Sequence, residues 1–144
     1  MMGRFFISSV FLLAASAVMT ATGAGTLPPE LTAQHNPGKR SELAIELAAK
    51  ALDQARGYYE TGKIDEADAQ LDLVEDLAKE CLESARQSRK EKYWKRAELK
   101  TAALSRHIHS LIDELSYTQR DRAKLLAKQI DSIHDKLLAG VMAK

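Results

Sequence analysis

The sequence predicts an all-α protein in which four antiparallel helices follow an amino-terminal signal segment. From residue 41 onward, small and apolar residues recur alternately at intervals of three and four, which is the spacing of one helix face. Only short polar or Gly-containing joints interrupt this pattern, and all three prolines lie before residue 38. A seven-residue apolar repeat favours helices that pack nearly antiparallel, at about 20° to one another.

The first 24 residues have the composition of a secretory signal peptide. Arg4 precedes an apolar run over 5–19 that only Ser interrupts, and small residues follow it. This order is typical of such a signal, and we expect cleavage after Gly23 or Ala24. The alternative is a membrane anchor, because the apolar segment nearly reaches spanning length. The sequence therefore predicts an exported protein, periplasmic or secreted after cleavage and membrane-anchored without it.

Residues 25–40 are expected to form a flexible lead-in, because they contain the three prolines, Gly38 and a basic pair. The four-helix domain is expected over 41–144. Its first helix should start near Ser41, a good N-cap that an acidic residue follows. The apolar seam of this helix consists of Ala44, Ala48, Ala51, Ala55 and Tyr58.

The second helix is expected from about Asp65 to Ser88, after a turn at Thr61-Gly62-Lys63. Its seam consists of Ile64, Ala67, Leu71, Val74, Ala78, Cys81 and Ala85. A polar turn over 87–90 precedes the third helix, whose seam consists of Trp94, Ala97, Thr101, Leu104, Ile108, Leu111 and Leu115. The fourth helix should be capped by Ser116 or Thr118 and stopped by Gly140. Its seam consists of Ala123, Leu126, Ile130, Ile133, Leu137 and Val141.

The short joints predict that each pair of consecutive helices forms an antiparallel hairpin. Folding the second helix on the third about residues 89–90 places Ala78 near Thr101. The first and second helices fold together about Gly62, and the third and fourth about Tyr117. The sequence thus predicts seam-to-seam packing in three successive hairpins.

Five residues around the first turn stand at characteristic spacings, namely Ala55, Tyr58, Gly62, Ala67 and Leu71. This succession of a small residue, Tyr, Gly, Ala and a large apolar residue resembles the central half of one tetratricopeptide repeat. The resemblance implies a protein-interaction scaffold or adaptor that presents a helix-lined concave face to a peptide or partner helix. The sequence leaves open whether the helices form such a short array or a closed up-down bundle.

If the resemblance extends to function, the candidate partner-binding residues are Tyr58, Tyr59, Tyr93, Lys92, Arg96 and Lys100. Tyr58 and Trp94 lie on the seams and are expected in the core, whereas Tyr59 and Tyr93 lie off the seams and are expected at the rim of a groove. The three cations stack at i,i+4, which is unfavourable unless a negative group lies nearby. The acidic first hairpin or an anionic envelope surface could supply that group.

Charge is divided between the two halves of the domain. Residues 41–88 contain 12 acidic and 5 basic side chains, and residues 89–144 contain 7 acidic and 13 basic ones. In a nuclear protein such a basic cluster with interleaved aromatic residues would indicate nucleic-acid binding, but the export signal argues against nucleic acid as a partner. The simpler interpretation is that both charged faces are only in contact with solvent. The alternative is a surface with one acidic and one basic region that binds another protein.

Reactive chemistry is not expected. His107 and His109 point about 200° apart on a helix, so they cannot share a metal ion within one chain. Asp131 and His134 have a spacing seen in metal-binding bundles, but no other helix offers a matching inward Glu. Cys81 lies on a seam and is expected to fill the core as an unreactive thiol. The sequence therefore predicts no enzymatic activity, no cofactor and no metal.

Two further functions stay open at this point. One is a small-ligand or metal-binding four-helix bundle, which needs inward polar residues such as Thr101. The other is a structural or regulatory homodimer, because heptad seams also associate between chains.

Overall fold

The computed structural model describes residues 27–143 of the chain. They form an all-α fold with four long antiparallel-packed helices, which confirms the predicted fold class. These helices are α2 (Pro37–Glu60), α3 (Ile64–Gln87), α4 (Glu91–Glu114) and α5 (Asp121–Met142). Two short elements accompany them, α1 (Pro29–Thr32) and the 3-10 helix η1 (Tyr117–Gln119). The predicted signal segment, 1–24, lies outside the described residues, and no helix within 27–143 has the length and apolar character needed to cross a membrane.

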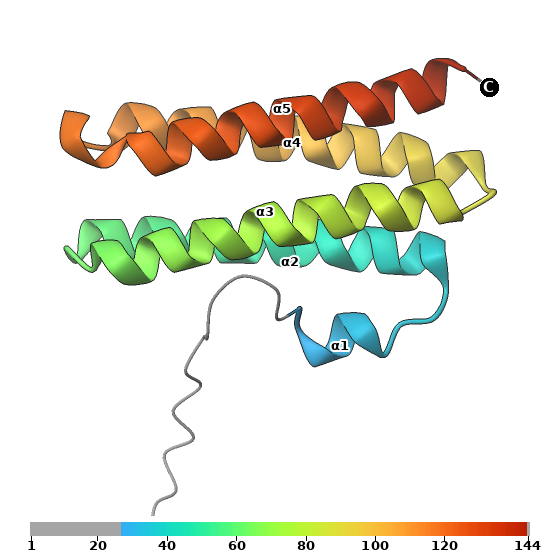
Figure 1. The fold of residues 1–144 in the computed structure, drawn as a ribbon, viewed down its shortest axis with the longest axis horizontal. Coiled ribbons are helices and arrows are strands. Elements are labelled where there is room, and N and C mark those ends of the chain that lie inside the picture. The colour runs from blue at the N-terminus through green and yellow to red at the C-terminus, as the bar shows by residue number, and fades with distance from the viewer. Residues whose placement is uncertain (1–26, 144) are drawn as a thin grey trace, which may run out of the picture.

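The four long helices are arranged as two helical hairpins stacked in two layers (Figure 1). α2 and α3 form one layer and make the most extensive helix contact in the molecule, and α4 and α5 form the other layer. α4 lies against α2 and α5 lies against α3, and each of these stacked pairs runs parallel. α3 and α4 lie diagonally across the molecule and touch only slightly.

The structure therefore corrects one of the three predicted hairpins, the packing of the second helix on the third. The reason is a second apolar stripe on α2, which consists of the buried residues Gly38, Ile45, Leu52 and Tyr59 at seven-residue spacing. At one end of this stripe, Gly38 contacts Tyr93 of α4. At the other end, Tyr59 lines a pocket together with Leu111 of α4. Because α2 must cover two neighbours, the connection over 88–90 crosses from one layer to the other.

The expected flexible lead-in over 25–40 is also corrected, because its described part is folded. The Asn36 side chain caps α2 by accepting a hydrogen bond from the backbone N–H of Lys39 at 3.1 Å. Pro37 occupies the first helical turn, where a missing N–H costs nothing. α2 thus begins before the expected cap. Further upstream, Leu31 of α1 is fully buried.

The turn between α2 and α3 forms as the sequence predicts. Gly62 adopts the left-handed conformation with φ of +76°. The backbone N–H of Lys63 then donates to the carbonyl of Tyr58 at 2.9 Å, which closes the end of α2. Small buried residues on both helices, such as Ala55 and Ala67, allow α2 and α3 to approach closely.

The predicted stop at Gly140 is wrong, since α5 continues to Met142. A Cβ at Gly140 would lie 2.0 Å from Cζ3 of Trp94, so this glycine makes room for an aromatic ring. Gly38 does the same for Tyr93, whose Cδ2 would lie 2.1 Å from an added Cβ. These two close contacts join the start of α2 and the end of α5 to the first turn of α4.

Candidate functional site

The predicted basic stripe lies on the side of α4 that faces α2, and consists of Lys92, Arg96 and Lys100. Arg96 Nη1 lies 2.5 Å from Glu42 Oε1, and Lys100 Nζ lies 3.0 Å from Glu46 Oε1. Lys92 Nζ lies over the Tyr93 ring, 5.0 Å from its centroid. The acidic first hairpin therefore supplies the expected negative groups, and two of the three cations form ion pairs within the molecule.

The aromatic candidates have the opposite burial from that expected. Tyr59 and Tyr93, expected at a rim, are buried, with 7% and 6% of their surface exposed. Tyr58 and Trp94, expected in the core, are only half-buried. The second apolar stripe of α2 explains why Tyr59 rather than Tyr58 is buried. This stripe turns Tyr59 toward α4 and leaves Tyr58 half-buried at the surface. The Trp94 indole donates to the backbone carbonyl of Ser88 at 3.3 Å.

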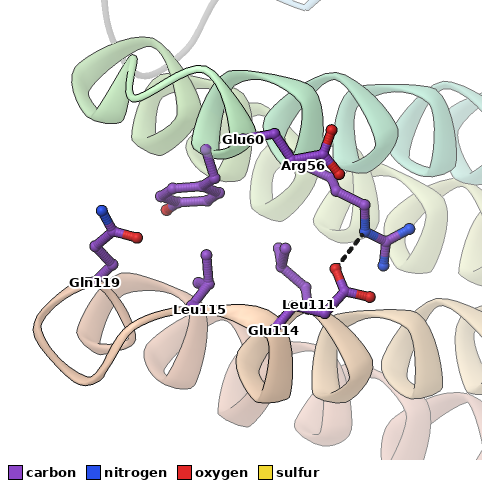
Figure 2. A pocket seen from close by; sticks show the side chains of 7 residues that line it. Arg56, Glu60, Leu111, Glu114, Leu115 and Gln119 are labelled. Carbon is purple, nitrogen blue, oxygen red and sulfur yellow. Dashed lines mark ion pairs between the residues drawn. The ribbon is translucent and has the colours of Figure 1, made fainter.

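A pocket of about 100 Å³ opens where the two hairpins meet, beside the turns at one end of the molecule (Figure 2). It is lined by Arg56, Tyr59, Glu60, Leu111, Glu114, Leu115 and Gln119. The carboxyl end of α2, the carboxyl end of α4 with its C-cap Leu115, and η1 supply these side chains. Figure 2 shows Leu111 and Leu115 pointing from α4 toward α2, with the Arg56–Glu114 pair on one side and Gln119 on the other.

The pocket combines an apolar floor with a charged rim. Arg56 Nε lies 3.1 Å from Glu114 Oε2 in an ion pair, and among the described residues Glu60 forms no ion pair. The Tyr59 hydroxyl donates to Asp68 Oδ1 at 2.5 Å. Burial, assisted by this hydrogen bond, raises the pKa of Tyr59, so the hydroxyl stays neutral and the ring is held as a fixed wall.

Two histidines bridge α4 and α5 in the second hairpin. His134 Nε2 lies 2.7 Å from Glu98 Oε1, and His109 Nε2 lies 3.3 Å from Asp131 Oδ2. Asp131 and His134 therefore each face a residue of α4 rather than forming the ligand pair that their spacing suggested. Across residues 27–143, no group of three or more His, Cys, Asp or Glu side chains could hold a metal ion.

Cys81 is fully buried, as predicted, where α2, α3 and α4 meet. Ser41, expected as a helix cap, instead donates from Oγ to the Cys81 carbonyl at 3.1 Å. Burial raises the pKa of the Cys81 thiol to about 11, against smaller opposing effects of the Ser41 and Thr101 hydroxyls. The thiol is therefore protonated at neutral pH and a poor nucleophile.

Sequence reasoning missed most of the pocket, namely Arg56, Glu60, Leu111, Glu114, Leu115 and Gln119 as a group. The signal that could have found them is the stripe of α2 residues at seven-residue spacing, which ends at Tyr59 and requires a third helix beside α2. Comparisons with protein-family models, with curated proteins and with solved structures found no match. What the pocket can bind is therefore inferred from its own geometry and charge.

Proposed function

We propose that this protein is an exported, non-enzymatic helical protein that acts as a protein-interaction scaffold or adaptor. The observation that carries the proposal is the pocket between α2, α4 and η1. An apolar floor, a fixed aromatic ring and a charged rim meet there at the surface, and such a combination concentrates binding energy in protein interfaces. The signal-like composition of residues 1–24 supports export.

The arrangement of the helices supports a short array that resembles tetratricopeptide repeats. Solenoids of this kind stack helix pairs side by side, as α2/α3 and α4/α5 are stacked here. Of the five residues that carry the resemblance, Ala55, Ala67 and Leu71 are fully buried, Tyr58 is half-buried and Gly62 lies exposed in the turn. The pocket lies between corresponding helices of the two pairs, where a partner could contact both.

The pocket suits a Lys or Arg side chain of the partner protein. Its rim carries one net negative charge, because Glu60 and Glu114 outnumber Arg56. The methylene stem of such a side chain can lie on the leucines while its cation reaches Glu60. The volume of about 100 Å³ is small beside the roughly 300 Å³ or more of pockets for small molecules and cofactors, which favours a single side chain.

A photo-crosslinking amino acid introduced at Gln119, in cells that produce the protein, tests this proposal. We expect a crosslink to a partner protein from position 119 and none from Gln129, an exposed position of α5. Glu114→Lys should abolish the crosslink because it reverses the charge of the rim. Glu83→Lys makes the same charge change at an exposed position near the carboxyl end of α3, away from the pocket, and should leave the crosslink intact.

Three results would count against the proposal. They are the absence of any crosslink at position 119, an equal yield at 119 and 129, and equal loss in both charge variants when circular dichroism shows both folded. A product of twice the mass of the chain would instead indicate the homodimer.

A further inference from the structure

One end of the molecule is strongly basic. Figure 1 shows the start of α2, the α3–α4 connection and the carboxyl end of α5 together at this end. The contacts of Gly38 with Tyr93 and of Gly140 with Trp94 hold these segments to one another. Over residues 37–42 and 80–96, eight Lys and Arg side chains accompany four Asp and Glu side chains, an excess of four positive charges.

Within residues 37–42 and 80–96 the acidic side chains are all paired with neighbouring cations, in the pairs Glu80–Arg40, Glu83–Arg86, Glu91–Lys95 and Glu42–Arg96. In the same two ranges, the exposed cations that form no ion pair with any described residue are Lys39, Arg89, Lys90 and Lys92. They come from three separate segments, namely the first turn of α2, the α3–α4 connection and the first turn of α4. Lys92 also lies over the Tyr93 ring, but no acidic side chain among the described residues neutralises any of the four charges, so they are available to an external partner.

The opposite end of the molecule has the opposite charge. Residues 53–72 and 110–125 contain nine acidic and five basic side chains, an excess of four negative charges, and the pocket lies at that end. A molecule with such opposed ends orients in an external field. On a negatively charged surface its basic end turns toward the surface and the pocket turns away from it.

We infer that the basic end docks on an anionic lipid surface through Lys39, Arg89, Lys90 and Lys92. Clustered Lys and Arg side chains bind anionic headgroups, and each cation strengthens binding by about fivefold. Met142, the last residue of α5, is 78% exposed at the same end and offers an apolar side chain to the headgroup region.

A surface fits these cations better than an acidic peptide does. The cations are spread over three segments at the end of the helix stack, and a planar surface can contact all of them at once. The two cations of the basic stripe that could have lined a groove, Arg96 and Lys100, are already paired with α2.

Co-sedimentation with lipid vesicles tests the inference. The protein should bind vesicles that contain phosphatidylglycerol and not vesicles of phosphatidylcholine alone, and high salt should release it. The double variant Arg89→Gln/Lys90→Gln should partition roughly 30-fold more weakly, at about fivefold for each cation. The control Lys63→Gln/Lys128→Gln removes the same charge from exposed positions elsewhere and should partition like the wild type. All variants share the same amino terminus, so any contribution of residues 1–26 cancels in the ratio.

Trp94, the only tryptophan in the chain, provides a second measurement. Because it lies near the basic end, its fluorescence should transfer energy to dansyl-labelled headgroups when the protein binds. Equal binding to both kinds of vesicle, or equal weakening of the double variant and its control, would overturn the inference. Binding to polyglutamate without binding to the anionic vesicles would assign the basic end to an acidic protein instead. None of these outcomes depends on the partner of the pocket.

Discussion

At Gly38 the absence of a side chain decides how two helices meet. The residue is buried in the first turn of α2, and the Tyr93 ring of α4 lies directly against its backbone. Three ring atoms lie within 2.5 Å of the place that a Cβ would take, so the whole ring would have to move. Tyr93 is held in that position by the helix on which it stands and is 6% exposed.

We expect Gly38→Ala to destabilise the protein by about 1–3 kcal/mol through overpacking, even though Ala is the better helix former. Gly57, in the same helix, has nothing within 4 Å of an added Cβ, and Gly57→Ala should stabilise the protein by about 0.5–1 kcal/mol. Urea unfolding of both variants gives the two changes in free energy. Stabilisation by both substitutions would show that Tyr93 can move aside without cost.

At the scale of single helices, periodicity predicted most of what is observed. The seams of α3, α4 and α5 are buried apart from half-buried residues at their ends, because one strong apolar stripe per helix is easy to recognise. α2 differs because it has two stripes. The Ala-rich seam has the clearer spacing, so the second stripe, which ends at Tyr59, was not predicted. The short α1 was not predictable, since a single buried Leu31 in a four-residue helix leaves no periodic signal.

The second stripe, which the sequence analysis did not recognise, also explains why the pocket was not predicted. Pairing helices by sequence order leaves α2 and α4 unpaired, so Tyr59 and Leu111 could not be brought together from the sequence. The basic stripe of α4 was recognised correctly, but its role as the partner of Glu42 and Glu46 follows only from the stacking of α4 on α2.

The second stripe of α2 should carry core energy of its own. Leu52 is 2% exposed, and we expect Leu52→Ala to cost about 2–5 kcal/mol, as for other buried leucines. Leu99→Ala removes the same atoms from a side chain that is 65% exposed and should change stability by less than about 0.5 kcal/mol. Chemical denaturation measures both. Equal, small effects would mean that α2 contacts α4 too loosely for the stripe to hold the two layers together.

For the whole molecule, the division of charge along the chain becomes an attraction between layers. The acidic first hairpin and the basic second hairpin face each other through Glu42–Arg96, Glu46–Lys100 and Asp72–Arg122. These pairs are partly exposed, and each contributes only about 0–1 kcal/mol, so they set the alignment of the layers more than their stability. The charge left over lies at the two ends, where the sequence order alone could not place it.

Hydrogen exchange can distinguish a short array from a closed bundle. In an array the terminal helix pair opens before the rest, because each pair contacts only its neighbour. α2 and α3 share the tightest interface, whereas α4 and α5 expose Leu99, Leu125 and Leu138 on their outer sides. We therefore expect amides in the middle of α5 to exchange roughly tenfold faster than those around Val74 and Cys81 in α3. Mass spectrometry of exchanged peptides measures this ratio. Equal protection of α2 to α5 would instead identify a bundle that opens only by complete unfolding.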